Sequence, residues 1–74
     1  MENKLKNVLS IVFNVDINKI NNESSPDSIP NWDSLAHMNL VVALEEEFDV
    51  EFNDDEINEM LNYALIKEIL NNKI

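Results

Sequence analysis

The sequence contains no cysteine, no glycine and only two prolines among its 74 residues. Without cysteine the chain can form no disulfide, which fits a reducing compartment such as the cytoplasm. Without glycine it lacks the tight elbow that presents a hydrolase serine and the central residue of an EF-hand calcium loop. No apolar run approaches the ~20 residues of a membrane span, and the N-terminus lacks the apolar stretch of a signal peptide. We therefore expect one domain over residues 1–74, cytoplasmic and without membrane contact.

Arginine is also absent, and the charge is mostly of one sign. Five lysines face fifteen carboxylates, for a net charge of −10. Residues 1–37 carry net −2 and residues 38–74 carry net −8. Phosphates of nucleic acid and anionic lipid would repel such a chain. We expect a monomer that binds no nucleic acid and whose partners are proteins with basic patches.

The spacing of apolar residues predicts an all-α fold of four helices. The helices should cover about residues 2–14, 34–48, 54–60 and 63–72, and no segment has the pattern of a strand. The third helix is short, and a long loop rich in Asn, Ser and Pro separates the first two. The first helix presents one apolar face formed by Leu5, Val8, Leu9, Val12 and Phe13, and the last one formed by Leu65, Ile66, Ile69 and Leu70.

Several polar residues are placed to begin these helices. Asp33 is the expected N-cap of the second helix. Asn53 and Glu56 are spaced as a capping box for the third. Within the long loop, we expect Trp32 to anchor the chain against the bundle, since such a ring buries ~150–250 Å². The residues predicted to be covered by the loop itself are Val15, Ile17 and Ile20.

The predicted second helix has two apolar stripes. At about 100° per residue, one stripe contains Leu40, Val41, Leu44 and Phe48, and we assign it to the core. The opposite stripe contains Leu35, Met38 and Val42, bordered by Asn39, Glu45 and Glu46. So small a domain does not bury both sides of one helix, and an exposed apolar strip with a charged rim is typical of a partner-binding surface. The alternative is that Leu35 packs on the loop and Met38 on Trp32.

The run "DSLAHMNLVVALEEEF" resembles the acyl carrier protein family, and the similarity extends over essentially the whole chain. The resemblance implies a four-helix acyl-carrier-like bundle with a long first loop and a short third helix. It implies that Ser34, within a motif completed by Asp33 and Leu35, receives 4'-phosphopantetheine from a separate phosphopantetheinyl transferase. The "WDSL" variant is similar to carriers that stand alone in specialised pathways.

The resemblance also implies a function and a partner surface. The chain would hold acyl groups as thioesters and present them to acyl-loading and acyl-transferring enzymes of fatty-acid or specialised acyl biosynthesis, without being an enzyme itself. Leu35, Met38 and Val42 match the family's recognition face, and Glu45 and Glu46 its acidic contacts. Ala36 and Asn39 depart from the family, which often has acidic residues there. Leu65 replaces a common Thr, so the last helix should begin earlier, with Asn62 as its cap.

Physical chemistry supports the attachment at Ser34 independently. A phosphodiester there would lie at a helix N-terminus, where free N–H groups and the macrodipole favour an anion. A chain without cysteine must also import the thiol that thioester chemistry needs, and the cofactor would then carry the chemistry.

Other functions remain as alternatives. The chain could carry amino acyl groups, as peptidyl or D-alanyl carriers do, or be an acidic helical interaction module that mimics nucleic acid. Asp33, Ser34 and His37 suggest a hydrolase, which also needs an oxyanion hole and a substrate cleft. The chain has no glycine for a tight elbow and is too small for an obvious cleft, and His37 is expected to border the core stripe. The acidic run 47–55 has the wrong spacing for an EF-hand. Its carboxylates form a solvated face or bind divalent cations loosely, and no specific metal site is predicted; they are Glu47, Asp49, Glu51, Asp54 and Asp55.

Overall fold

Helix α1, Glu2–Phe13, opens the computed structural model, which describes all 74 residues. On its inner face Leu5, Val8, Leu9 and Phe13 are buried, as the sequence predicts. Val12, predicted for the same face, is half-buried. The helix ends one residue before the predicted boundary because Asn14 adopts a left-handed conformation with φ of 54°. Asparagine is one of the few residues other than glycine that tolerate this conformation. On the outer face Ile11 is 80% exposed.

The loop between α1 and α2 is ordered by short-range hydrogen bonds. It contains a single 3-10 turn, Ile17–Lys19, which Asp16 caps. Further along, the Oγ of buried Ser24 accepts from the N–H of Asn21, at 2.9 Å. Three apolar side chains of the loop are buried beneath it, namely Ile20, Ile29 and Trp32, whereas Val15 and Ile17 are half-buried.

Helix α2, Ser34–Phe48, has the predicted bounds and carries the two predicted stripes. Leu40, Val41 and Leu44 are buried. Phe48, placed in the same core stripe from the sequence, is only half-buried and packs at the edge of the core. The helix ends at Asp49, whose φ of 54° again provides a left-handed C-cap in a chain without glycine.

Two shorter helices complete the fold, each ending within one residue of its predicted boundary. Helix α3, Asp54–Glu59, begins with the predicted capping box of Asn53 and Glu56. Helix α4, Tyr63–Asn71, begins with the predicted cap, in which Asn62 accepts from the N–H of Leu65 at 2.8 Å. Its buried residues are Tyr63, Ile66 and Leu70, while Leu65 and Ile69 are half-buried.

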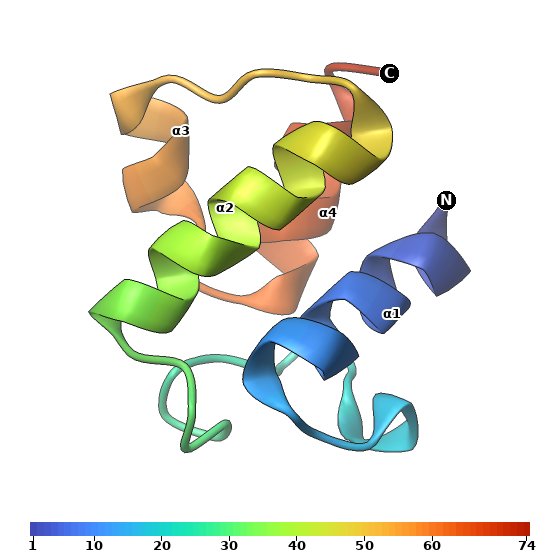
Figure 1. The fold of residues 1–74 in the computed structure, drawn as a ribbon, viewed down its shortest axis with the longest axis vertical. Coiled ribbons are helices and arrows are strands. Elements are labelled where there is room, and N and C mark those ends of the chain that lie inside the picture. The colour runs from blue at the N-terminus through green and yellow to red at the C-terminus, as the bar shows by residue number, and fades with distance from the viewer.

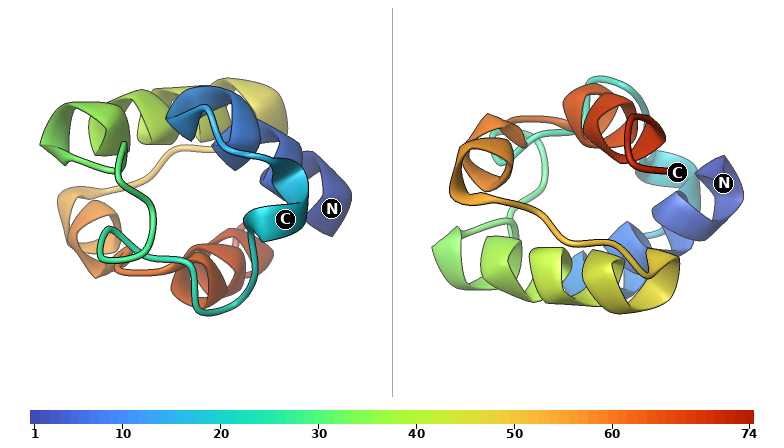
Figure 2. Two further views of the ribbon diagram at one scale, coloured as in Figure 1. Left: turned by 90° about the horizontal axis from the view of Figure 1, so that it is seen from below. Right: turned by 90° about the horizontal axis from the view of Figure 1, so that it is seen from above.

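The four helices enclose one hydrophobic core, and no strand is present. Helix α1 packs against α2, and α3 and α4 pack against each other. The long loop closes the end of the bundle at which α2 begins, as Figures 1 and 2 show. Both chain termini lie near the other end of α2 (Figure 1). None of the helices is long and apolar enough to cross a bilayer.

Candidate functional site

Ser34 is the first residue of α2 and is exposed. The preceding residue, Asp33, has extended backbone geometry and is the N-cap, as predicted: its Oδ1 accepts from the N–H of Ala36 at 2.8 Å. The N–H groups of Ser34 and Leu35 are bonded to no protein group, as is usual in a first helical turn. The Ser34 hydroxyl also has no protein partner. The site therefore presents a free hydroxyl beside two free N–H donors.

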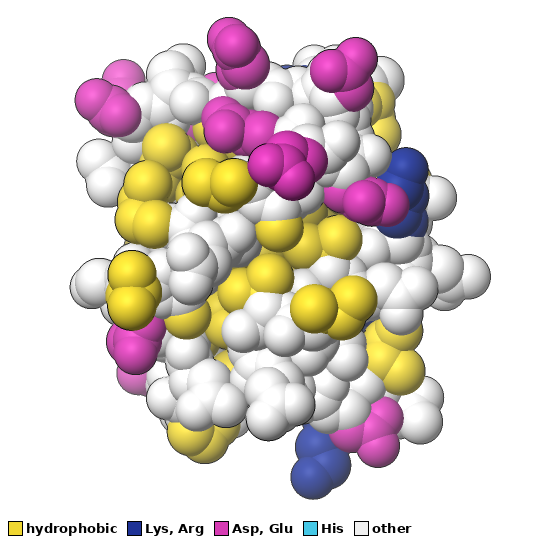
Figure 3. All heavy atoms as spheres, viewed as in Figure 1, with side chains coloured by type: hydrophobic (Ala, Val, Ile, Leu, Met, Phe, Trp, Pro, Cys, Tyr) yellow, Lys and Arg dark blue, Asp and Glu magenta, His cyan; other side chains and the backbone are white.

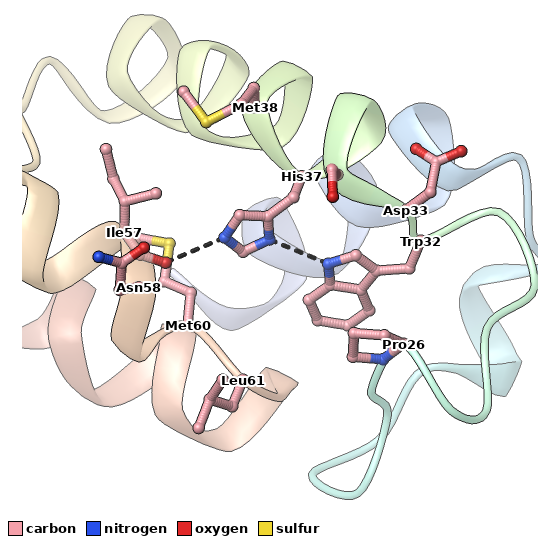
Figure 4. Close-up of a pocket in the computed structure, with 10 residues that line it drawn as sticks. Pro26, Trp32, Asp33, His37, Met38, Ile57, Asn58, Met60 and Leu61 are labelled. Carbon is pink, nitrogen blue, oxygen red and sulfur yellow. Dashed lines mark hydrogen bonds between the residues drawn. The ribbon is translucent and has the colours of Figure 1, made fainter.

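A chain of aromatic and hydrogen-bonded contacts lies beside Ser34. Trp32 is 4% exposed and stacks on Phe13 with ring centroids 4.7 Å apart, so it anchors the loop as predicted. The indole Nε1–H of Trp32 donates to His37 Nδ1 at 3.0 Å. On the other side of the imidazole, Nε2 lies 3.0 Å from the carbonyl oxygen of Ile57 in α3 (Figure 4). We call this set of contacts the His37 bridge.

The partners of the His37 bridge define the state of the imidazole. An indole N–H can only donate and a carbonyl can only accept, so Nδ1 is the acceptor and Nε2 carries the proton. Both ring nitrogens are therefore occupied, and no hydrogen bond joins His37 to Ser34. This arrangement does not provide the serine–histidine contact that a hydrolase would need. The prediction that His37 borders the core is confirmed, because the residue is half-buried.

A pocket of about 480 Å³ opens between Ser34, the loop, α2 and α3 (Figure 4). Its volume lies within the range of small-ligand sites. Leu61, for which the sequence predicts no role, lines this pocket and is 63% exposed. Leu61 follows the short third helix, where no periodic pattern indicates which way an apolar residue points. The pocket is lined by Pro26, Trp32, Asp33, Ser34, His37, Met38, Ile57, Asn58, Met60 and Leu61.

The outer stripe of α2 is exposed, as predicted. Leu35 is 73% exposed, Met38 47% and Val42 52%. This exposure contradicts the alternative that Leu35 packs on the loop and Met38 on Trp32. Figure 3 shows apolar side chains gathered on this face beneath a row of carboxylates. An apolar strip beside acidic groups is suited to a partner that combines apolar and basic side chains.

The three polar residues that border this stripe differ in exposure and in hydrogen bonding. Asn39 and Glu46 are exposed. Glu45 is half-buried, and its Oε2 accepts from the backbone N–H of Phe52 at 2.9 Å. One oxygen of Glu45 thus binds the segment that follows α2. The two residues are seven apart, and the helical period does not predict this hydrogen bond.

Two groups with shifted pKa values lie outside the pocket. The backbone N–H of Asn53 and the side chain of Lys73 lower the pKa of Glu56 below its ordinary value of 4.5. Burial, together with the negative charge of Glu2, raises the pKa of Tyr63 to about 12. No three side chains of His, Cys, Asp or Glu gather as a metal-ligand set.

The chain is similar in sequence and in structure to known acyl carrier proteins. The chain is 35% identical to an acyl carrier protein of Buchnera aphidicola subsp. Schizaphis graminum, over 99% of this chain and 92% of the relative. It is 35% identical to an acyl carrier protein of Thermosynechococcus vestitus, over 96% of this chain and 88% of the relative. The solution structure of a holo acyl carrier protein from Geobacter metallireducens is similar, with a TM-score of 0.86 and 31% identity over 96% of this chain and 82% of the other. No family model matches the chain.

Proposed function

The chain belongs to the acyl carrier protein family, and from this premise we propose that Ser34 carries its 4'-phosphopantetheine. An acyl carrier acts by holding a cargo and presenting it to other proteins. The observation that carries the assignment to Ser34 is the exposed hydroxyl, without a protein partner, at the first position of α2 within the Asp33–Leu35 motif. A modifying enzyme can approach such a hydroxyl without opening the fold.

The residues around Ser34 suit a phosphodiester. The N–H groups of Ser34 and Leu35 have no protein acceptor, and the positive end of the α2 dipole lies there. No acidic side chain occupies the first turn of α2. The nearby carboxylate of Asp33 is engaged with the N–H of Ala36. When attached, the group supplies the thiol that this cysteine-free chain lacks, and acyl groups are carried on it as thioesters.

The outer stripe of α2 supports the proposal for partner binding. Leu35, Met38 and Val42 begin one residue after Ser34 and stay exposed. The proposed partners are a phosphopantetheinyl transferase and the acyl-loading and acyl-transferring enzymes of fatty-acid or specialised acyl biosynthesis. Asn39, Glu45 and Glu46 border the stripe, so basic patches on these enzymes would meet the two carboxylates there.

The test is covalent modification measured by intact mass. Incubation of the protein with coenzyme A and a broad-specificity phosphopantetheinyl transferase should add one phosphopantetheine group. Ser34→Ala should abolish the adduct while helical content stays nearly unchanged, because Asp33 rather than Ser34 caps α2. Ser28→Ala is the matched control, since Ser28 is also exposed but lies in the loop.

The outcomes distinguish the alternatives. An adduct on Ser34→Ala would show that another residue is modified. No adduct on the wild type would favour an acidic helical interaction module. An amino acyl cargo is distinguished at the next step, by testing whether candidate adenylating enzymes load amino acids or fatty acids onto the modified protein.

A further inference from the structure

A single hydrogen bond forms the whole polar connection between α2 and α3. It joins His37 Nε2 to the Ile57 carbonyl oxygen at 3.0 Å. No other hydrogen bond and no ion pair links the two helices. Apart from apolar contacts, the seam between α2 and α3 therefore depends on His37.

His37 also lies between Ser34 and the core. Both residues line the same pocket, and Figure 4 shows the imidazole crossing it from Trp32 toward Ile57. Along α2, the next core-facing residues after His37 are Leu40, Val41 and Leu44, and all three are buried. An apolar group that enters the seam from the Ser34 end therefore meets the His37 bridge before it reaches these core residues of α2.

Opening the His37 bridge has a definite physical cost. The indole N–H of Trp32 is buried and has His37 Nδ1 as its one acceptor. The Ile57 carbonyl loses less, because it also accepts from the N–H of Met60 at 3.3 Å. A buried donor left without an acceptor is strongly unfavourable. A short group that stays in the pocket leaves both bonds of His37 in place.

We propose that His37 determines cargo specificity. The His37 bridge confines acyl groups to the pocket beside Ser34 and thereby selects short acyl chains over long ones. The inference rests on the proposed attachment at Ser34. The pocket is large enough for a small ligand outside the bridge, and its walls include the apolar side chains of Met38, Ile57 and Leu61. A long chain must either remain in solvent or displace the imidazole.

The test compares acyl chain lengths on one protein. The phosphopantetheinyl transferase is supplied with butyryl-, octanoyl- or dodecanoyl-coenzyme A, and intact mass confirms each adduct. Two quantities are then measured: the rate at which hydroxylamine cleaves the thioester, relative to the same acyl-pantetheine free in solution, and the NMR resonance of the Trp32 indole N–H. In the wild type, the butyryl group should be protected about twofold or more, because an open pocket covers part of a small ligand that lies against its apolar side chains. The dodecanoyl group should react at the free rate, and the indole resonance should stay in place with all three.

Variants at the bridge test whether the imidazole is responsible. His37→Ala should extend protection to the octanoyl and dodecanoyl groups and shift the indole resonance. His37→Gln, whose amide can both accept and donate, should restore the wild-type preference. Trp32→Phe removes the indole donor but keeps an aromatic ring against Phe13, so it should extend protection even if His37→Ala fails to fold.

Opposite results overturn the proposal in distinguishable ways. Equal relative rates for the three acyl groups in the wild type, or an unchanged preference in Trp32→Phe and a folded His37→Ala, exclude His37 as the determinant while leaving the attachment at Ser34 intact. A wild type that forms no adduct with any of the three donors excludes the attachment and this inference together.

Discussion

The two ends of α2 are held in different ways. At the C-terminal end, Glu47 pairs with Lys4 of α1 at 3.7 Å, and the Lys4 ammonium lies 5.1 Å from the centre of the Phe48 ring. At the N-terminal end, where the helix meets the long loop, there is no ion pair. The Asp33 cap and the His37 bridge supply the side-chain hydrogen bonds there.

The contacts of the lysines also differ between the two ends of α2. Four of the five each form an ion pair and each lie over an aromatic ring, namely Lys4, Lys6, Lys67 and Lys73. None of these contacts involves residues 26–38. In a chain with net charge −10, these four lysines thus contact Glu2, Tyr63 and residues between 47 and 56, away from Ser34. The Ser34 end is left with apolar contacts and with side-chain hydrogen bonds, without an ion pair.

The largest expected effect comes from truncating leucines at the two ends of α2. Leu44 is 0% exposed, so Leu44→Ala should cost about 2–5 kcal/mol of the unfolding free energy. Leu35 is 73% exposed, so Leu35→Ala should change it by less than about 0.5 kcal/mol but slow the transferase reaction. Denaturant unfolding of both variants beside a modification-rate assay checks this. Equal destabilisation by the two changes would place Leu35 in the core and remove the proposed partner surface.

A smaller effect is expected at Tyr63, on the side of the bundle where α1 meets α4. Its buried hydroxyl has no hydrogen-bond partner in the structure, although Lys6 and Lys67 lie over its ring. Tyr63→Phe keeps the ring and removes the unpaired hydroxyl, so it should raise the unfolding free energy by about 1 kcal/mol. Thermal unfolding gives the comparison. A clear loss of stability would mean that the hydroxyl is bonded in solution, for which the Glu2 carboxylate is a candidate.

The smallest effect is expected at Glu56, which Lys73 contacts at 2.9 Å. Its pKa is lowered in the folded state, so the unfolded chain takes up the proton first as the pH falls. The stabilisation is complete above the ordinary pKa of 4.5 and is lost as the pH drops through the folded-state value. Glu56→Gln should therefore lower the melting temperature slightly at neutral pH and have no effect in strong acid. A difference that persists at about pH 2 would contradict the assignment to the charge, because Gln keeps a side-chain oxygen that can accept from the N–H of Asn53.

Much of the fold and the position of the candidate site could be predicted because the controlling interactions are local. Asp33, Asn53 and Asn62 cap their helices through backbone groups three residues away. The two stripes of α2 follow from the period of the helix, and Leu35 and Leu44 lie on opposite sides as that period requires. That Ser34 stands exposed at a helix start follows from the same local rules.

The remaining features depend on residues that the chain brings together from a distance. The sequence places His37 beside the core, but its contact with Ile57 spans 20 residues and exists only because α3 packs there. The same holds for Glu45 and Phe52, and for the unpaired hydroxyl of Tyr63. Short-range caps and helical periods depend on backbone geometry that every helix shares. Long-range partners depend on how four particular helices pack, and neither the spacing nor the composition of this chain specifies that arrangement.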